Sequence, residues 1–484
     1  MSRPTAIVLG GGLAGIAAAV RLASAGVAVT LVETRQRLGG RATSFVDPTT
    51  GQVLDNCQHV LLGCCTNLLD LYARLGVAQC IAWQKSIYFA TPVDEPRTQW
   101  VIDTLQADDL PAPLHLSASL LAFQGLKPGE KIALARAMLA MMRIGRTGRA
   151  GYHGLTFARF LDDQGQPRSL VEKFWAPVGV GAVNETVERM PADYAMQVFQ
   201  EGMLAHQEAW LMGLASVPLV KLYDPAEKVI TAAGGQVLLS TSVQGFSTGA
   251  DGSRVTGLQI DGGRELHAEV CLSALPFDRV DKLLTPAMRA ADARLARLGE
   301  LTVSPILGIH LFFRCPPDRP VMNLPHVALT RSPLHWVFNK SMDVGEGGGM
   351  VQHLHGVISA AHDLVDQPAE AIMALALEEI ARVFPRARGS KLHHARVIKE
   401  KRATFSARPG IAALRPAQAP GPKGVRNLYL AGDWTATGWP ATMEGATRSG
   451  YLAAAAALAD LGLSPGDNVP DLPASAVYRM LAGK

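Results

Sequence analysis

The chain begins with a short apolar run, a glycine-rich turn and a longer segment of small apolar residues. Residues 5–9 have the composition of a buried β-strand, residues 14–25 predict a helix that ends at Gly26, and residues 27–32 predict a second strand. Strand, turn, helix and strand follow one another closely, which is typical of a compact βαβ unit.

Two changes of pattern divide the rest of the chain. Residues 66–214 predict helices with irregular links, whereas residues 217–270 return to strands separated by glycine-containing turns. The individual strands expected here and farther along are 237–243, 255–260, 271–274, 305–313, 349–358 and 428–431. An amphipathic helix is expected at residues 369–383, and a closing helix of small residues at 445–461.

A chain of 484 residues is too long for one simple core, so two or three domains are expected. The βαβ-like pattern comes in three blocks, residues 1–65, 216–275 and 400–465, which we expect to fold together as one discontinuous Rossmann-like domain. Residues 66–215 and 276–399 then form a second domain of mixed sheet and helix, and 466–484 a C-terminal tail. The expected fold class is α/β, and α+β for the whole chain.

Composition narrows the class of protein. The net charge of +4, from 46 basic and 42 acidic residues, is too balanced to indicate a nucleic-acid partner. Six cysteines occur without a Cys-x-x-Cys pair, so we expect no zinc or dithiol site, and free thiols fit a reducing cytoplasm. His353 and His355 alternate on a predicted strand without an evident third ligand, so no metal is expected.

Three glycines, Gly10, Gly12 and Gly15, form a Gly-x-Gly-x-x-Gly turn between the first strand and the first helix. The first glycine allows a tight turn, the second lets the backbone approach a pyrophosphate, and the third lets helix and strand pack closely. The helix N-terminus at Leu13 and Ala14 offers free N–H groups and a partial positive charge to phosphates. The turn therefore predicts a dinucleotide site.

The residues after the second strand indicate which dinucleotide is bound. Glu33 ends that strand, where a carboxylate accepts hydrogen bonds from ribose hydroxyl groups. Next come Gly39, Gly40 and Arg41: paired glycines let the chain pass close to a cofactor, and the arginine neutralises a pyrophosphate. An NAD domain has no need for such a loop, so we expect FAD.

The segment Glu33-x-x-x-x-Leu38-Gly39-Gly40-Arg41 resembles the N-terminal signature of the FAD-dependent amine oxidase and phytoene desaturase superfamily. A second signature of that superfamily matches Leu430-Ala431-Gly432-Asp433-Trp434 and the later Met443-Glu444-Gly445-Ala446. The two matches stand at opposite ends of the chain and imply an amine oxidase-type FAD-binding domain interleaved with a substrate domain.

The resemblance also implies roles for single residues. Gly432 and Asp433 would bind near the pyrophosphate and ribitol. The helix that Met443, Gly445 and Ala446 open would direct N–H groups at the flavin N1–C2 carbonyl and so stabilise the anionic reduced flavin. The backbone of a further residue would contact the adenine, and this residue is Val243.

Three further segments resemble a narrower group, the squalene-associated FAD-dependent desaturases. These segments are 55–67, 174–185 and 438–446. Members of this group are hydroxysqualene dehydroxylases of bacterial hopanoid synthesis. The implied reaction is reductive: the hydroxyl group of hydroxysqualene is protonated and lost, and the allylic cation takes hydride from reduced flavin to give squalene.

Candidate catalytic groups lie in the first of these segments. Asp55 and His59 are four residues apart, in a loop that by family analogy passes near the flavin, and either is a candidate general acid. The alternative is that both only hold the loop or bind the cofactor. Glu444 is more plausible as a cap of backbone N–H groups than as an acid. Trp434 and Trp439 either face the flavin or pack in the core.

Membrane contact is a further expectation, because a squalene-sized substrate resides in the bilayer. Residues 116–142 contain apolar runs and are followed by Arg143, Arg146 and Arg149, a pattern typical of a helix that lies on anionic lipid. Internal packing of this helix is the alternative. No stretch reaches the roughly 18 apolar residues of a membrane span. We expect a cytoplasmic protein with peripheral contact to the inner membrane, a long-chain isoprenoid substrate and other squalene-synthesis enzymes as partners.

Three rival interpretations stay open. The first is a desaturase of a carotenoid precursor such as phytoene, with the same cofactor motifs. The second is a flavin amine oxidase, which needs a lysine near flavin N5 that the sequence does not place. The third is a lipid carrier that keeps FAD as a structural group.

Overall fold

The computed structural model describes residues 3–344, 350–466 and 468–483. Its N-terminal strands lie in a five-stranded parallel sheet of order β10-β2-β1-β14-β20. The strands are β1 Thr5–Leu9, β2 Ala28–Val32, β10 Gln236–Leu238, β14 Val270–Ser273 and β20 Leu428–Leu430. Three distant stretches of sequence thus build one sheet. The domain boundaries given above stay a prediction.

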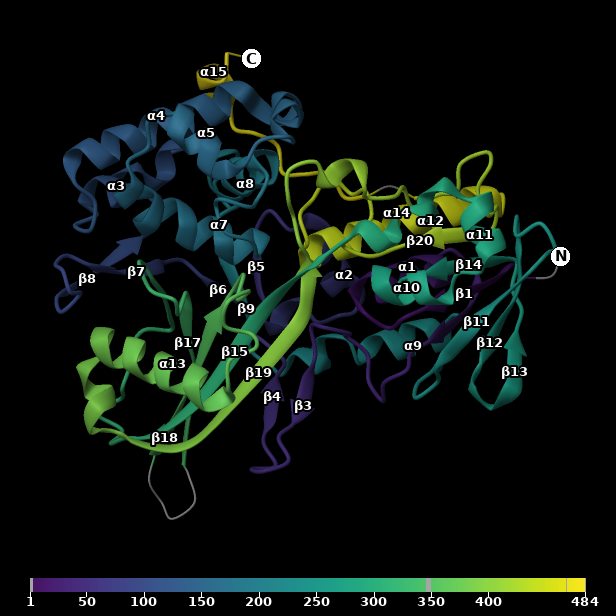
Figure 1. Cartoon of the computed structure of the whole chain (residues 1–484), viewed down its shortest axis with the longest axis horizontal. Helices are drawn as coiled ribbons and strands as arrows, with labels where there is room; N and C mark the ends of the chain where they lie inside the picture. Colours follow the sequence, from purple (N-terminus) through teal and green to yellow (C-terminus); the bar gives the residue numbers. More distant parts are fainter. Residues whose placement is uncertain (1–2, 345–349, 467, 484) are drawn as a thin grey trace.

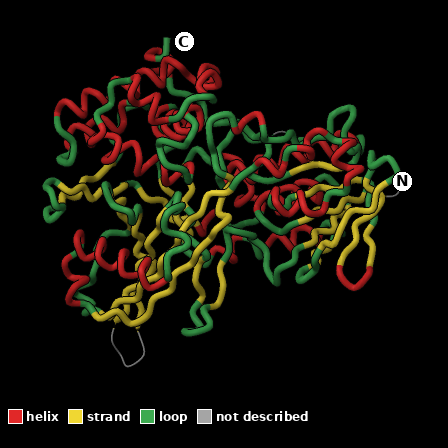
Figure 2. The backbone as a smooth tube through the Cα atoms, in the orientation of Figure 1, coloured by secondary structure: helices red, strands yellow, loops and turns green. Residues whose placement is uncertain are grey.

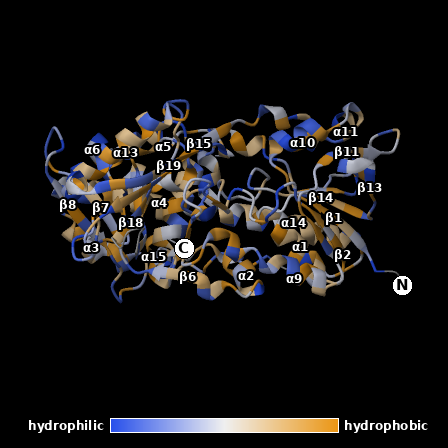
Figure 3. Ribbon diagram, turned by 90° about the horizontal axis from the view of Figure 1, so that it is seen from below, coloured by the Kyte–Doolittle hydropathy of each residue, from blue (hydrophilic) through white to orange (hydrophobic). Residues whose placement is uncertain are grey.

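Two helices of small residues pack against each other beside this sheet (Figure 1). They are α1, Leu13–Ser24, and α14, Met443–Asp460. Gly450 of α14 meets α1 so closely that a Cβ there would lie 2.2 Å from the carbonyl oxygen of Ala14. Seen from below, apolar residues dominate α1 and the neighbouring strands, whereas the surface helix α10, Phe277–Leu283, is largely polar (Figure 3).

A three-stranded antiparallel sheet lies at the same end of the molecule. It consists of β11 Val243–Thr248, β12 Val255–Ile260 and β13 Arg264–Leu266. The shorter helices of this half are α2 Thr66–Arg74, α9 Pro225–Ala232, α11 Pro286–Ala291 and α12 Ala293–Ala296.

The other half contains a seven-stranded sheet of order β19-β15-β18-β17-β16-β7-β8 (Figure 2). Its strands are β7 Ile87–Pro92, β8 Trp100–Leu105, β15 Val303–Arg314, β16 His326–Leu329, β17 Trp336–Val344, β18 Met350–Ile358 and β19 Lys391–Phe405. Helix α13, Ala369–Val383, covers one face through a shared apolar cluster. The opposite face is turned toward the first half of the molecule.

Two small β elements connect the halves. One is the hairpin of β3, Ser44–Val46, and β4, Val53–Asp55. The other is a three-stranded sheet of β5 Val60–Leu62, β9 Met212–Ala215 and β6 Ile81–Gln84. The hairpin begins directly after the segment that contains Gly39, Gly40 and Arg41, and β5 follows the hairpin, so the chain passes through both elements from one half to the other.

A layer of helices packs on the end of the seven-stranded sheet (Figure 1). Its helices are α3 Ser117–Ala122, α4 Pro128–Gly148, α5 Phe157–Asp163, α6 Arg168–Leu170, α7 Ala176–Val183 and α8 Ala192–Phe199. The interior holds an aromatic cluster in which the ring of Trp175 meets Phe199 edge-on at 4.7 Å and also contacts Phe157 and Phe174. Two π-helical turns, Val171–Trp175 and Gln200–Leu204, flank this cluster.

Most expected elements are present, and the differences have physical reasons. The helix at 369–383 and the strand at 255–260 have the predicted bounds. The expected strand 237–243 divides into β10 and β11, because the first part joins the parallel sheet and the second the antiparallel one. The segment 66–214 is not all helical: it contains β6, β7 and β8, which pair with strands distant in sequence.

The predicted C-terminal tail contains a short helix. Helix α15, Ala476–Leu481, packs on the helical layer, with Tyr478 buried and the N–H of Ser475 donating to the carbonyl oxygen of Ala205 at 2.8 Å. Among the described residues, no helix is both long enough and apolar enough to cross a bilayer.

The aromatic cluster gives a first prediction. Replacing Trp175 by alanine leaves a cavity among rings and removes the hydrogen bond from its indole N–H to Gln166, so we expect a loss of about 3–5 kcal/mol of stability. Thermal unfolding of the variant should show a clearly lower Tm. Val46→Ala, at a side chain that is 62% exposed, should leave Tm nearly unchanged. Equal Tm values for the two variants would contradict the importance of this cluster.

Candidate active site

The glycine turn after β1 brings the chain very close to the start of α1. Gly10 has φ +96°, and a Cβ on Gly15 would lie only 1.8 Å from the carbonyl oxygen of Gly10. The helix begins at Leu13, and no side chain caps its first turn. The N–H groups of Leu13, Ala14 and Gly15 therefore point out of an uncapped helix end, where an anion is stabilised.

The side chain of Glu33 lies at the rim of this turn. Its carboxylate accepts hydrogen bonds from the N–H of Gly11 at 2.7 Å and from the N–H of Arg35 at 2.8 Å, and it is 7% exposed. The carbonyl oxygen of Glu33 accepts a bond from the N–H of Thr241, two residues before Val243. The structure therefore brings Glu33 and Val243 into one region, where the sequence analysis expects the ribose and the adenine.

The Gly39-Gly40-Arg41 segment lies directly against the glycine turn. The N–H of Gly39 donates to the carbonyl oxygen of Gly11 at 2.8 Å, and a Cβ on Gly40 would approach the Cα of Gly12 to 2.9 Å. The guanidinium of Arg41 forms an ion pair of 2.7 Å with Asp433, almost 400 positions later in the sequence. The two ends of the chain thus meet at this point.

The C-terminal signature forms the other side of the site. Gly432 has φ +140°, and its N–H donates to the hydroxyl of Ser449 at 2.7 Å. Helix α14 starts at Met443, with Thr442 as its cap: the Thr442 hydroxyl accepts a bond from the N–H of Gly445 at 3.0 Å, and the Thr442 carbonyl oxygen accepts one from Ala446 at 2.9 Å. The predicted cofactor residues near both chain ends therefore border one region.

The carboxylate of Glu444 caps the start of helix α2, although Glu444 itself belongs to helix α14. Its fully buried carboxylate accepts hydrogen bonds from the N–H groups of Asn67 and Leu68, at the start of α2, and pairs with Arg448. The capping role favoured from the sequence agrees with this geometry. The acceptor belongs to one end of the chain and the donors to the other, which no local pattern indicates.

The residues of this region fit FAD. A Cβ on Gly10, Gly15 or Gly40 would lie 3.0 Å or less from a backbone atom, so only glycines allow this close turn at an uncapped helix end, and Arg41 contributes a cation beside it. A pyrophosphate needs N–H donors and a positive charge, and both are present. Gly10, Gly12, Gly15 and Arg41 would hold the pyrophosphate, and Glu33 the ribose.

The two candidate acids have different surroundings. The buried carboxylate of Asp55 accepts hydrogen bonds from the Ser44 hydroxyl at 2.8 Å and the N–H of Leu219 at 3.0 Å, and it pairs with the ammonium of Lys340 at 3.1 Å. Asp55 is therefore fully engaged in holding the end of β4.

His59 has one ring nitrogen unengaged. Its Nδ1 lies 3.0 Å from the carbonyl oxygen of Cys57 and must donate to it, while its Nε2 has no partner among the described residues. The ring is half-buried, and burial lowers its pKa. The roles given to Asp55 and His59 stay predictions.

Sequence reasoning missed several groups behind this loop. Lys340 of β17 bonds to Asp55 and to Gln58, so a lysine does lie near the loop, but with its ammonium already paired. The ring of His310 lies 2.9 Å from Nε2 of His353 and 3.0 Å from the carbonyl oxygen of Asp55, and stacks on His355 at 3.9 Å. The alternating positions of the histidines along β15 and β18 were the signal that the sequence offered. Which rings meet depends instead on the pairing of strands that are distant in sequence.

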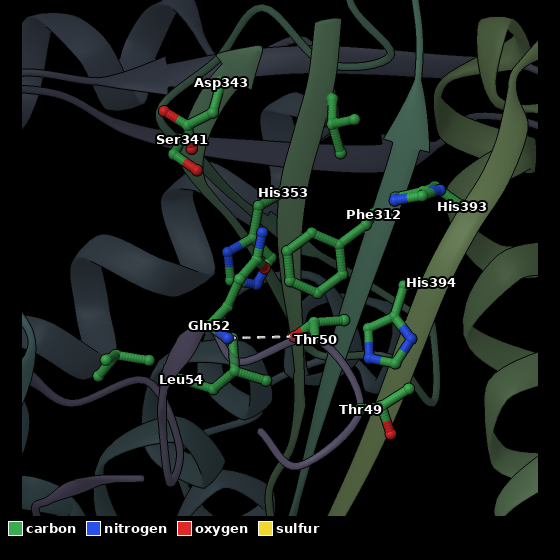
Figure 4. Close-up of a pocket in the computed structure, with 12 residues that line it drawn as sticks. Thr49, Thr50, Gln52, Leu54, Phe312, Ser341, Asp343, His353, His393 and His394 are labelled. Atoms are coloured by element: carbon green, nitrogen blue, oxygen red, sulfur yellow. Dashed lines mark hydrogen bonds between the residues drawn. The ribbon is translucent and has the colours of Figure 1, made fainter. Parts of the chain in front are cut away.

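These imidazoles extend from the loop to a surface cavity. The cavity measures about 640 Å³ and lies between the β3–β4 hairpin and the seven-stranded sheet (Figure 4). His353, Phe312 and His394 line it, and the ring of Phe312 stacks on His353 at 4.2 Å. None of the predicted cofactor residues is among its lining residues, so it is separate from the FAD site. No group of three or more possible metal ligands occurs in the described ranges.

Asn184 and Glu185 serve the packing of the two layers. The Asn184 side chain donates to the Thr404 hydroxyl at 2.9 Å and accepts from the N–H of Ala360 at 2.7 Å. The buried Glu185 accepts from His362 at 3.1 Å. Both residues thus bind the helical layer to the seven-stranded sheet.

The two tryptophans of the C-terminal signature are also largely packed. Trp434 is almost fully buried and its indole N–H donates to the carbonyl oxygen of Leu275, and the ring of Trp439 lies 4.7 Å from the Arg448 guanidinium. The contacts of Trp434 and Trp439 are therefore those of side chains packed in the protein interior.

Comparison with known proteins identifies relatives along nearly the whole chain. Residues 13–458 match the model of a family described as flavin containing amine oxidoreductase. The chain is 30% identical over 464 residues to the hydroxysqualene dehydroxylase of Rhodopseudomonas palustris, covering 94% of this chain and 98% of that protein. It is 27% identical over 466 residues to the 15-cis-phytoene desaturase of Synechococcus elongatus, covering 93% and 95%.

Solved structures share the fold. An oxidoreductase from Methanosarcina mazei superposes with a TM-score of 0.69 at 18% identity, covering 92% of this chain and 98% of that one. A putrescine oxidase bound to putrescine gives 0.68 at 16% identity, covering 95% and 99%. At these identities the likeness concerns the fold alone.

The glycine cradle gives a second prediction. Gly15→Ala forces a Cβ against the Gly10 carbonyl and should abolish binding at the helix end, so purified protein should carry little or no flavin absorbance relative to protein absorbance. Gly151→Ala is the matched control, because a Cβ there meets nothing within 4 Å. Normal flavin content in the Gly15 variant would contradict this assignment of the turn.

The buried histidines give a third prediction, on stability against pH. Burial lowers the pKa of His310 and of His326 to about 4, whereas an unfolded histidine titrates near 6.5. As pH falls below 6.5, these histidines take up protons in the unfolded chain but not in the folded chain. The free energy of unfolding should therefore have its full value above about pH 7 and decrease toward pH 5. Thermal unfolding at pH 7.5 and 5.5 checks this.

His326 offers the control for this prediction. Neither ring nitrogen has a hydrogen-bond partner among the described residues, and the ring lies among Tyr88, Trp336 and Phe338. His326→Phe should therefore reduce the difference in Tm between the two pH values. An unchanged difference would show that His326 does not contribute to it.

Proposed function

We propose a substrate for this chain on the premise that it belongs to the family of flavin-containing amine oxidoreductases, which its match over residues 13–458 shows. Its cofactor is FAD and its fold is that of the FAD-dependent amine oxidases, as the sequence predicts. It is an oxidoreductase. Within this family we propose that it removes the hydroxyl group of hydroxysqualene reductively, giving squalene.

The observation that carries this proposal is the end-to-end likeness to a hydroxysqualene dehydroxylase, at 30% identity over 98% of that protein. The three segments that resemble this group lie beside the predicted cofactor residues or between the aromatic cluster and the sheet. Residues 55–67 contain the loop against Arg41, and residues 438–446 lead into α14. Residues 174–185 join the aromatic cluster to the sheet.

The residues of the chain supply what this reaction demands. Bound FAD provides the hydride-transfer chemistry. His59 is the proposed general acid: with Nδ1 fixed on the Cys57 carbonyl, a protonated ring carries its second proton at Nε2, which is free to give it to a leaving hydroxyl group. Burial makes that proton more acidic by lowering the pKa of His59. Asp55, paired with Lys340, keeps the loop in place.

An apolar interior favours the same substrate. Phenylalanine, tryptophan and methionine side chains fill the helical layer, among them Phe174, Trp175, Met141 and Met203. These side chains pack on one another in the core, and an apolar interior of this kind suits a long isoprenoid chain.

A phytoene desaturase is the second candidate function. The cyanobacterial 15-cis-phytoene desaturase is 27% identical over 95% of its length, and several plant desaturases of the same name match at 25–27%. That reaction removes hydrogen from an isoprenoid and needs oxidised FAD, whereas dehydroxylation needs reduced FAD. The direction of electron flow therefore separates the two.

Membrane contact belongs to the proposal as well, with a corrected surface. The guanidinium groups of Arg146 and Arg149 are already paired with the buried carboxylate of Glu201, whereas Arg143 is exposed. The exposed apolar side chains lie earlier: Leu121 is 71% exposed and Ile132 is 62% exposed. Lys127 and Lys131 lie between them in the sequence, so we propose that α3 and the start of α4 rest on an anionic bilayer of the inner membrane.

The fourth prediction tests the reaction. Enzyme reduced without oxygen should convert added hydroxysqualene to squalene, and the absorbance of oxidised flavin should return in step with product. His59→Gln should slow this by roughly 10²- to 10⁴-fold, as expected when a general acid is lost. His153→Gln, the same change at an exposed ring, should leave the rate unchanged. The proposal fails if hydroxysqualene is not consumed while oxidised enzyme desaturates phytoene.

The fifth prediction tests the membrane surface. Wild-type protein should sediment with vesicles containing anionic lipid at low salt, and Leu121→Asp with Ile132→Asp should abolish this, because two carboxylates replace the apolar anchors. Val46→Asp with Val53→Asp, at side chains that are also exposed, should bind as wild type does. Equal sedimentation of both double variants would exclude α3 and α4 as the contact.

A further inference from the structure

Arg415 occupies an unusual position beneath the C-terminal flavin signature. It follows the short turn Ile411–Ala413 and its side chain is 6% exposed. The loop of residues 433–439 surrounds its guanidinium. One nitrogen donates to the carbonyl oxygen of Trp439 at 2.7 Å, and another donates to the carbonyl oxygen of Asp433 at 2.8 Å and to the Thr437 hydroxyl at 3.0 Å.

The hydrogen-bond partners of Arg415 are all neutral. Its fourth acceptor is the hydroxyl of Tyr194, and the rings of Tyr194 and Phe405 lie 5.6 Å and 4.9 Å from the guanidinium carbon. Among the described residues Arg415 forms no ion pair, and its Nε has no hydrogen-bond partner. The carboxylate nearest along the loop, Asp433, is already paired with Arg41 at 2.7 Å.

A buried cation without a carboxylate is costly unless another anion compensates for it. Arg448, a partly buried arginine beside this loop, follows the usual rule, since it pairs with Glu444 and Asp471. Within the part of the chain that the structure describes, Arg415 therefore has neutral hydrogen-bond acceptors but no carboxylate partner. The loop around it joins Gly432 and Asp433 to the N-terminus of α14, where the cofactor residues lie.

We propose that Arg415 provides the positive charge that stabilises the reduced form of the bound FAD. Reduced flavin carries a negative charge that oxidised flavin lacks, so a fixed cation nearby favours reduction. The effect adds to that of the α14 N-terminus, which has the same sign. Arg415 acts through the electric field of its positive charge and by holding the 433–439 loop in place. It is therefore a positioning residue. This inference depends on FAD binding and not on the proposed substrate.

The pyrophosphate of FAD is the other anion that Arg415 can compensate, and the two sources are distinguishable. The charge of the pyrophosphate does not change on reduction. A cation that serves the pyrophosphate therefore alters FAD affinity equally in both redox states and leaves the reduction potential unchanged. A cation that serves reduced flavin alters the affinities unequally and shifts the potential.

The test is the reduction potential of the FAD-loaded enzyme, measured against reference dyes without substrate. In Arg415→Gln the equilibrium constant for reduction should fall at least tenfold, which is about 30 mV for a two-electron couple. Arg415→Lys keeps the charge and should recover most of that potential. An unchanged potential in Arg415→Gln, or an equal loss of affinity for oxidised and reduced FAD, overturns the proposal.

A second pair of variants decides the matter even if Arg415→Gln does not fold or bind FAD. Thr437→Asp places a carboxylate within reach of the Arg415 guanidinium and neutralises its charge, and Thr437→Asn has nearly the same shape without charge. The aspartate should lower the potential, and the asparagine should not. Equal potentials for the two overturn the proposal. Because no substrate enters the measurement, failure here is distinct from failure of the dehydroxylase assignment.

Discussion

The close approach of backbone to backbone at a few glycines is the constraint on which the rest of this structure depends. Gly12 and Gly40 nearly touch, and Gly450 packs on the carbonyl oxygen of Ala14. With a side chain at Gly40 or Gly450, the Cβ would lie less than 3 Å from backbone atoms, so the helices and loops could not approach this closely. These contacts bring the glycine turn with α1, the segment of Gly39 and Gly40, and α14 together beside the parallel sheet, and the predicted FAD site lies where they meet.

Polar residues then join this half of the molecule to the other half. Arg415 reaches from the 433–439 loop to Tyr194 of α8, and Asn184 reaches from the helical layer to β19. Such bonds are directional, and a buried polar group without its partner is costly, so they fix the orientation of the layers more strictly than apolar packing alone. The substrate side is thereby held in a defined position relative to the cofactor side.

The sequence predicted local features well and long-range ones poorly. The glycine turn, Glu33, the helix at 369–383 and the strand at 255–260 all depend on residues close together in the chain, so a pattern identifies them. The partner of Glu444, the lysine beside Asp55 and the stacking of His310 on His355 depend on strand order and register. No spacing along one strand indicates them, because their partners lie hundreds of residues away. Resemblance to a family suggested the adenine contact of Val243, which stays a prediction and which no local pattern indicates.

The order of the strands in the parallel sheet has a consequence for how the chain is made. β14 pairs on one side with β1 and on the other with β20, which lies near the end of the sequence. During synthesis the free edge of β14 and the small-residue face of α1 therefore stay exposed to solvent until β20 and α14 have left the ribosome. An exposed edge of this kind is a template for wrong pairing. The nascent chain is thus most dependent on chaperones late in translation, and a protein cut short before residue 460 exposes both surfaces permanently.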